Sequence, residues 1–155
     1  NISDEVQSIH NELDKITTDF VPSEYFNKSF YDSVKSIFSS LNARNIQTKY
    51  QLAYPAPTIN NFSKVNICRI LQEIVANIIK HSDASNVQVK IYYNTNLTIQ
   101  IIDDGLGFEM EERKGGIGLL NIESRVNGMN GKIEIETTKG NGTHILFKIP
   151  LKVLK

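Results

Sequence analysis

The sequence predicts an α+β domain, a two-layer α/β sandwich in which helices pack on one face of a mixed, mostly antiparallel sheet. Two observations lead to this fold class. Apolar residues recur at helical spacing in several long segments, and elsewhere they alternate with polar residues, as in half-buried strands. Short turns join consecutive strand-like segments in the second half of the chain, which favours antiparallel pairing. The length of 155 residues suits one domain with its own core.

The first half of the chain is expected to hold three helices and one strand. Each helix has an apolar stripe at helical spacing, and the strand has alternating polar and apolar residues. The expected elements are a helix from a cap at Ser3 or Asp4 to about Phe20, a helix from Phe26 to Leu41, a strand from Ile46 to Leu52, a loop at Pro55 and Pro57, and a long helix from a cap at Ser63 to about Lys80.

The second half is expected to hold four strands and one helix. The segment from Glu109 to Gly115 is polar, charged and aperiodic, which predicts a mobile loop. The expected elements are strands from Val87 to Tyr93 and from Leu97 to Asp103, a helix from Gly118 to Met129 that Asn130 and Gly131 stop, and strands from Lys132 to Thr137 and from His144 to Leu151.

The composition excludes several classes of protein. Lys plus Arg equal Asp plus Glu at 17 each, so no net charge points to a nucleic acid or an anionic membrane as partner. The only cysteine, Cys68, excludes a disulfide framework and fits a reducing cytoplasm. No apolar run approaches the length of a membrane span. Because the chain starts at Asn1, we expect a cytoplasmic fragment of a longer protein, whose missing part leaves room for a membrane anchor.

Four polar residues share one face of the long helix, within a sector roughly 100° wide. These residues are Glu73, Asn77, Lys80 and His81, and apolar residues that include Ile74 and Ile78 occupy the opposite side. The amide oxygen of Asn77 suits Mg²⁺, Lys80 can meet a phosphate, and Glu73 can accept a proton. The alternative is an ordinary solvated helix face, and for His81 a structural role at the helix end.

An acidic turn, Asp103-Asp104-Gly105-Leu106-Gly107, follows an apolar strand. A carboxylate at Asp103 would be partly buried and would need a donor, which the exocyclic amine of adenine can supply. Gly105 and Gly107 would let the backbone approach a flat ring. The alternative is a simple Asp-Gly turn.

Two further glycine turns follow. Gly116 and Gly118 lie just before a predicted helix, whose free N–H groups would form an anion site. This motif is neither a P-loop nor a dinucleotide fingerprint, and a flexible glycine loop is the alternative. Its position one mobile loop after the acidic turn predicts a lid between an adenine site and a phosphate site. Thr143 could bind Asp103 directly or through water, or could simply favour the strand it enters.

The four motifs in this order could together hold adenine, a triphosphate and a metal ion. They resemble the ATP-binding domain of two-component sensor histidine kinases, in the GHKL superfamily whose Bergerat fold gyrase, Hsp90 and MutL share. More narrowly, the chain is similar to the subfamily that pairs with response regulators of the NarL type. The residues that carry this resemblance are Arg69-Ile70-Leu71-Gln72-Glu73, Asn77, Lys80-His81-Ser82-Asp83-Ala84 and the stretch from Gly118 to Arg125.

The resemblance implies roles for individual residues. Asn77 would bind Mg²⁺, Glu73 and Asn77 would be catalytic, and Asp103 would bind adenine. Gly140 and Gly142 would belong with Thr143 to a third glycine motif. The implied ATP-binding residues are Asn77, Lys80, His81, Asp103, Gly105, Gly107, Gly116, Ile117, Gly118, Leu119 and Thr143.

The implied activity is that of a protein histidine kinase with ATP and Mg²⁺ as cofactors. Residues 1–22 would be the end of the second helix of a dimerisation hairpin, and residues 23–155 the ATPase domain. His10 is followed by Asn11 instead of an acidic residue, so we expect the phosphate acceptor upstream of Asn1. The expected partners are the hairpin of a homodimeric parent and the receiver domain of a response regulator, with no nucleic acid and no membrane contact by this fragment.

Two other functions remain open from the sequence. One is a serine kinase of the anti-sigma-factor type with the same pocket, and phosphorylation of serine instead of histidine would identify it. The other is a non-catalytic module that senses nucleotide. A parent protein that binds ATP but never autophosphorylates would favour that module.

Overall fold

The computed structural model describes residue 2, residues 27–110 and residues 116–155. Three predictions therefore lie outside the described residues. They are the helix from Ser3 or Asp4 to Phe20, the hairpin segment 1–22 except for residue 2, and the assignment of His10. Most of the expected lid also lies outside them. Among the described residues, no helix is both long enough and apolar enough to cross a membrane.

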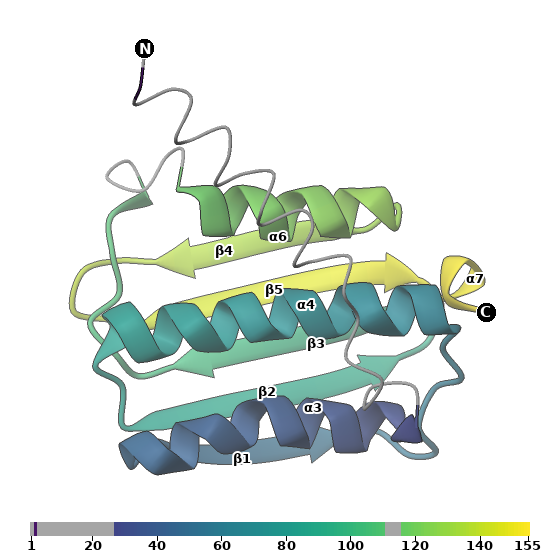
Figure 1. Cartoon of the computed structure of the whole chain (residues 1–155), viewed down its shortest axis with the longest axis horizontal. Coiled ribbons are helices and arrows are strands. Elements are labelled where there is room, and N and C mark those ends of the chain that lie inside the picture. Colours follow the sequence, from purple (N-terminus) through teal and green to yellow (C-terminus); the bar gives the residue numbers. More distant parts are fainter. Residues whose placement is uncertain (1, 3–26, 111–115) are drawn as a thin grey trace.

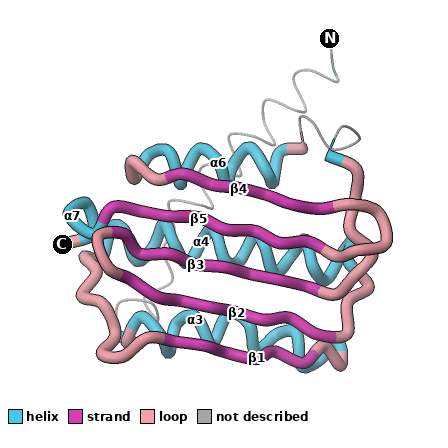
Figure 2. The backbone as a smooth tube through the Cα atoms, turned by 180° about the vertical axis from the view of Figure 1, so that it is seen from behind, coloured by secondary structure: helices cyan, strands magenta, loops and turns pink. Residues whose placement is uncertain are grey.

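One five-stranded sheet faces the viewer in Figure 2, with the helices behind it. Its strands lie in the order β1-β2-β3-β5-β4. Strand β1 runs parallel to β2, and the remaining neighbours are antiparallel, so the predicted mixed, mostly antiparallel sheet is confirmed. The strands are β1 (Gln47–Leu52), β2 (Asn86–Tyr93), β3 (Asn96–Asp103), β4 (Lys132–Thr137) and β5 (Thr143–Pro150).

The helices cover one face of this sheet, with α4 between α3 and α6 (Figure 1). This arrangement is the predicted two-layer sandwich. The described helical segments are α3 (Phe30–Phe38), the 3₁₀ segment η1 (Ser39–Arg44), α4 (Asn61–Asn77), the π-helical segment η2 (Ile78–Ser82), α6 (Ile117–Gly128) and the short α7 (Leu151–Leu154).

The core lies between the two layers. Strand burial alternates, as it should when helices cover only one face of a sheet. The residues that point toward the helices are largely apolar, and Phe38, Leu71 and Phe147 are fully buried. On the opposite face the strands carry polar side chains such as Gln88, Lys90 and Glu134, which suits a face exposed to water.

Three helix starts differ from the predictions, and the smallest difference is in α6, which begins at Ile117 instead of Gly118. Helix α3 begins at Phe30 instead of Phe26, because the hydroxyl of Ser29 accepts a hydrogen bond from the N–H of Asp32 and caps the helix. Helix α4 begins earlier than predicted, because Asn60 and not Ser63 is its cap. The Asn60 side chain accepts from the N–H of Ser63 at 2.8 Å, and Ser63 itself is buried. The last strand also ends one residue early, since Leu151 starts α7.

The end of the long helix has a different geometry from the predicted one. The regular helix ends at Asn77, and the chain continues through a π-helical turn to Ser82. The Ser82 hydroxyl donates to the carbonyl of Ile78 at 2.9 Å, and Asp83 ends the turn in a left-handed conformation. A π turn is wider than an α turn, so residues after Asn77 no longer follow 100° spacing.

Candidate functional site

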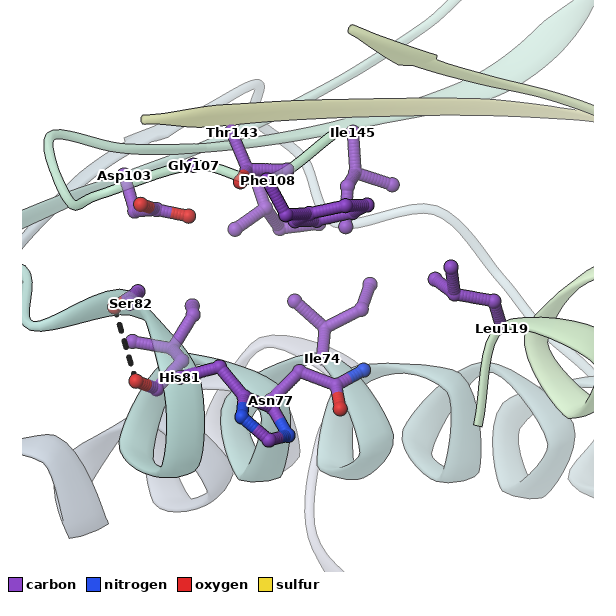
Figure 3. A pocket seen from close by; sticks show the side chains of 12 residues that line it. Ile74, Asn77, His81, Ser82, Asp103, Gly107, Phe108, Leu119, Thr143 and Ile145 are labelled. Atoms are coloured by element: carbon purple, nitrogen blue, oxygen red, sulfur yellow. Dashed lines mark hydrogen bonds between the residues drawn. The ribbon is translucent and has the colours of Figure 1, made fainter. Parts of the chain in front are cut away.

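A pocket lies between the sheet and the C-terminal end of the α4–η2 helix, next to the ends of β3 and β5 (Figure 3). Side chains of the helix form one wall, and side chains of the two strands form the other. The start of α6 closes a third side. The lining residues are Ile74, Asn77, Ile78, His81, Ser82, Ile101, Asp103, Gly107, Phe108, Leu119, Thr143 and Ile145.

Six of the predicted site residues come together in this pocket, from four separate parts of the chain. They are Asn77, His81, Asp103, Gly107, Leu119 and Thr143. Strand pairing explains one of these meetings, because Asp103 and Thr143 are direct partners in the antiparallel register of β3 and β5. The two residues are far apart in the sequence, so local sequence pattern could not predict this pairing.

Asp103 is the one buried acid of the pocket. It is 6% exposed, at the last position of β3. Burial raises the pKa of this carboxyl, while hydrogen bonds from the backbone of Gly105 and Thr143 oppose the rise in pKa. The N–H of Gly105 donates to Oδ1 at 2.9 Å. A buried acceptor held in this way gives a fixed direction to any donor that enters the pocket.

The neighbouring acid, Asp104, has a structural role. It is exposed, and it accepts hydrogen bonds from the backbone of Ser85 and Asn86 and from the side chain of Asn86, each at 2.8 Å. Burial alone would raise its pKa, but the bonds from Asn86 and Ser85 lower the pKa overall. Asp104 therefore ties the β3 end to the start of β2 and does not belong to the pocket lining.

Two glycines let the loops around Asp103 pack backbone against backbone. Gly107 has a φ of +59°, and a Cβ there would lie 2.2 Å from the carbonyl oxygen of Thr138. Gly142 has a φ of +71°, and a Cβ there would lie 2.1 Å from the carbonyl oxygen of Asp103. Both positions combine a left-handed backbone with a close approach, so an L side chain fits neither.

Hydroxyl groups link the last hairpin to the acidic turn. Thr137 Oγ1 accepts from the N–H of Phe108 at 3.0 Å and donates to the carbonyl of Gly142 at 3.0 Å. The Thr143 hydroxyl lies 3.2 Å from Thr137 Oγ1. The contact of Thr143 with Asp103 in this structure is made by its backbone, whereas the sequence analysis expected the hydroxyl.

The polar face of the long helix divides at the π turn. Asn77 and His81 line the pocket, but Lys80 is exposed and lies outside the lining. Glu73 lines a separate cavity between α4 and α6, together with Arg69, Asn121 and Arg125. Its carboxylate lies beside the start of α6, since a Cβ on Gly118 would come within 2.3 Å of Oε1.

The start of α6 fits an anion. Gly116 precedes the helix, and no side chain of the described residues caps it. The first N–H groups of a helix have no partner within the helix, so here they remain available to a phosphate. Gly118 lies in the first turn, with Asn77 close by, since a Cβ on Gly118 would lie 3.7 Å from Asn77 Nδ2. The second glycine motif thus lies next to the polar face of α4.

The residues of the pocket fit a magnesium ion that arrives with its nucleotide. Mg²⁺ commonly takes one or two protein oxygens and completes its shell with phosphates and water. The side-chain amide of Asn77 is half-buried and borders the pocket, near the start of α6 (Figure 3). The described residues contain no group of three or more His, Cys, Asp or Glu that could hold a metal by itself.

The apolar lining of the pocket was missed by the sequence analysis. Ile74 and Ile78, assigned to the face opposite the polar one, also reach the pocket. Ile101 and Ile145 could have been found, because each lies two residues from Asp103 or Thr143 and so shares its face of the strand. Phe108 also lines the pocket, and its place directly after Gly107 is the only signal for it in the sequence.

Comparisons with known proteins agree with this geometry. Residues 63–153 match the family described as histidine kinase-, DNA gyrase B- and HSP90-like ATPases. The signal transduction histidine-protein kinase/phosphatase DegS of Brevibacillus brevis is 39% identical over 90 residues, which are 57% of this chain and 23% of DegS. The sensor histidine kinase ComP of Bacillus subtilis is 37% identical over 95 residues, 59% of this chain and 12% of ComP. The chain thus spans less than a quarter of either relative.

Solved structures share the fold. The histidine kinase AdeS of Acinetobacter baumannii has a TM-score of 0.70 at 17% identity, covering 96% of this chain and 81% of that one. The histidine kinase domain of the blue-light activated kinase EL346 of Erythrobacter litoralis has a TM-score of 0.66 at 18% identity, covering 79% and 59%. These likenesses confirm the predicted α+β sandwich.

The fold and the pocket together define an ATP-binding domain, with a buried acid at the end of a strand and, across the pocket, a helix start that no side chain of the described residues caps. The chain belongs to the family of histidine kinase-, DNA gyrase B- and HSP90-like ATPases. The predicted resemblance to sensor histidine kinases is confirmed by these relatives. The narrower similarity to the subfamily that pairs with NarL-type regulators stays a prediction.

Proposed function

We propose that this chain is the catalytic domain of a two-component sensor histidine kinase, which binds Mg²⁺–ATP and presents its γ-phosphate to a histidine of the parent protein. The observation that carries the proposal is the position of Asp103 and Asn77 on opposite walls of one pocket (Figure 3). The buried carboxylate on one wall suits the adenine base. The amide oxygen on the other wall suits the Mg²⁺ ion that accompanies the nucleotide. The relatives named as histidine kinases support the choice of acceptor.

Each end of the nucleotide has its own partners in this proposal. The Asp103 carboxylate accepts a hydrogen bond from the exocyclic amine of adenine, while the apolar residues Ile101 and Ile145 contact the ring. The phosphates lie near the start of α6, where Gly116, Ile117 and Gly118 supply backbone N–H groups. Mg²⁺ supplies charge neutralisation to the phosphates when it is bound, and Asn77 is its protein ligand.

The remaining predicted residues have less direct roles. Gly105 and Gly107 shape the base site, and Leu119 lines it beside the phosphates. Lys80 and His81 lie at the π turn, where Lys80 is exposed and can reach a phosphate from outside the pocket. Glu73 lies beside the start of α6, close to where the terminal phosphate would be, so its carboxylate can accept a proton there.

The reaction forms one bond and breaks another. A neutral imidazole nitrogen of the acceptor histidine attacks the γ-phosphorus, the bond to the bridging oxygen breaks, and ADP leaves. The protein contributes mainly position and charge stabilisation. We place the acceptor on a dimerisation hairpin of a homodimeric parent, and the phosphoryl group then passes to an aspartate of a response regulator, with a NarL-type regulator as the expected partner.

Nucleotide titration with and without Mg²⁺ tests the metal site. Asn77→Ala should remove the Mg²⁺ dependence of ATP binding without loss of fold, because Asn77 is half-buried and outside the fully buried core. Asn127→Ala, at an exposed position near the end of α6, is the matched control and should bind as the natural chain does. A thermal melt of each variant shows that the fold is kept. An Asn77→Ala variant with unchanged Mg²⁺-dependent affinity would refute the metal assignment.

A further inference from the structure

The base site is too small for a base in this structure. The cavity between Asp103 and the helix wall has a volume of about 30 Å³. One ordered water needs roughly 10–15 Å³ of such volume, and small-molecule sites typically span about 300 Å³ or more. The cavity therefore has room for one or two waters, and nucleotide binding requires a side chain or a loop to move.

The largest side chain that lines the cavity is Phe108. Its ring lies beside Thr143 and Ile145 and extends from the strand side of the pocket toward Leu119 (Figure 3). Phe108 is half-buried and comes from the loop after β3, whereas most of the lining belongs to helices and strands. Phe108 is therefore partly accessible to solvent, and it belongs to a loop instead of a regular element.

The backbone that carries Phe108 is fixed. The N–H of Leu106 donates to the carbonyl of Ser82 at 2.6 Å, and the N–H of Gly140 donates to the carbonyl of Leu106 at 2.5 Å. The N–H of Phe108 itself donates to Thr137 Oγ1 at 3.0 Å. Gly107 is packed against Thr138 and Gly142 with no room for a Cβ. The side chain can rotate about its own bonds far more easily than this loop can move.

We propose that the Phe108 ring is a gate of the base site, closed over the cavity in this structure and rotated aside when adenine enters. In the open position the ring forms a wall against the face of the base. This inference rests on the proposed position of adenine beside Asp103 and adds a mechanism that controls access to it. Only the open fraction of molecules can bind, so the gate lowers the apparent rate and affinity of nucleotide binding.

The association rate of a fluorescent ADP, measured by stopped flow without Mg²⁺, tests the gate. Phe108→Ala removes the ring and should raise the association rate constant about tenfold, because a minor open state is commonly populated at 10% or less. Phe108→Leu keeps an apolar side chain of smaller size and should give an intermediate rate. Leu106→Ala is the matched control: Leu106 is two residues away, 55% exposed and outside the lining, so its rate should be that of the natural chain.

The two rate constants separate a gate from a fixed wall. A wall that only stacks on the base would leave association unchanged in Phe108→Ala and would raise dissociation alone, and that result would overturn the proposal. Binding of ADP by Phe108→Ala or Phe108→Leu alone, with none by the natural chain, would support it. Absence of binding in all variants would overturn both the gate and the base site. Failure of phosphotransfer, in contrast, would refute the proposed kinase and leave this measurement intact.

Discussion

At the scale of single residues, two adjacent acids show how environment decides function. Asp103 and Asp104 are identical in chemistry, but one ends a strand inside the pocket and the other lies on the surface. Burial raises the pKa of Asp103, and hydrogen bonds lower the pKa of Asp104. A carboxylate kept in a site that opposes its charge costs folding stability, which is common for a binding residue.

Asp103→Asn should weaken ATP binding and stabilise the ligand-free fold. An amide can present a donor to the adenine amine, and losing a charge-assisted hydrogen bond costs roughly 1.5–3 kcal/mol, about ten- to a hundredfold in affinity. Stability should rise because the buried charge disappears while the Asn oxygen can still accept from Gly105. Isothermal titration and thermal melts measure both effects. GTP is the ligand control, since natural protein that bound GTP as well as ATP would show that Asp103 does not read adenine.

The pH dependence of that stability has a definite sign. A group whose folded pKa is raised contributes stability that is fully present below its unfolded pKa and is lost as the pH rises through its folded pKa. The gain from Asp103→Asn should therefore be largest near neutral pH and shrink as the pH falls toward 3.8, the ordinary pKa of the group. Asp104→Asn is the matched variant. Because the pKa of Asp104 is lowered in the folded chain, Asp104→Asn should lose stability at neutral pH, and this loss should shrink only below pH 3.8. ATP binding by this variant should be unchanged.

Cys68 should be unreactive while the domain is folded. It is fully buried in α4, and burial raises the pKa of its thiol to about 11. Only the thiolate attacks a disulfide reagent, so at pH 8 both access and ionisation are lacking. Ellman's reagent should label the natural chain slowly, at the rate of unfolding, and label it at once in denaturant. Rapid labelling of folded protein would contradict the position of Cys68 in the core.

At the scale of elements, turns and helix ends build the site more than the regular segments do. The π turn Ile78–Ser82 keeps His81 at the pocket and leaves Lys80 exposed. The acidic turn and the β4–β5 hairpin turn interlock, since Gly107 packs on the carbonyl of Thr138 and Gly142 on that of Asp103. The position of the Asp103 carboxylate therefore depends on a hairpin far away in the sequence.

Two glycines of that hairpin should respond differently to alanine. Both have positive φ, +71° at Gly142 and +87° at Gly140, but a Cβ on Gly140 would meet nothing within 4 Å. Gly140→Ala should cost only the backbone strain, of order 1–3 kcal/mol. Gly142→Ala adds a clash with the backbone of Asp103, so it should destabilise more and also weaken ATP binding. Urea denaturation and nucleotide titration of both variants measure this. Equal losses in the two variants would mean that the interlocked turns do not matter.

At the scale of the whole molecule, the sandwich places the proposed binding elements of the described residues at one end of the sheet. Asp103 ends β3 and Thr143 begins β5, while α4 runs toward the same end and α6 starts there (Figure 1). The other face of the sheet is polar, so among the described elements the helical layer buries most of the apolar surface. In the proposed kinase, a domain of this shape would hold the nucleotide at one end, where the phosphate acceptor of the parent protein would approach it.

The isolated chain should bind ATP but should not phosphorylate itself. His10 is followed by Asn11, whereas the resembled acceptor motif has an acidic residue there. Incubation with γ-labelled ATP should leave the chain unlabelled, and addition of the separately made dimerisation hairpin should give an acid-labile label on the hairpin histidine. A hairpin with its acceptor histidine changed to glutamine is the control. Label on His10 would contradict our account, and acid-stable label on serine would favour the serine-kinase alternative.

Much of the molecule could be predicted from local pattern. The four strands of the second half, the helix before Met129 and the two-layer arrangement follow from periodicity and turn residues, which act over a few positions. Asn77, Asp103 and the glycine turns could be predicted as site residues from local sequence. Asn77 lies on a polar helix face, Asp103 follows an apolar strand, and the glycines lie beside helix and strand ends. Helix starts could not be predicted from local pattern, because Ser29 and Asn60 compete with other capping residues nearby.

Local patterns in the sequence identify the class of fold and the polar side chains that suit a nucleotide. Which of those side chains meet is set by the tertiary fold. Helical spacing placed Lys80 with Asn77, but the π turn separates them, and no local pattern predicts one wider turn. Register brought Thr143 to Asp103, and close packing put Phe108 into the base site. Each of these depends on contacts between segments distant in the chain, which short-range propensities do not encode.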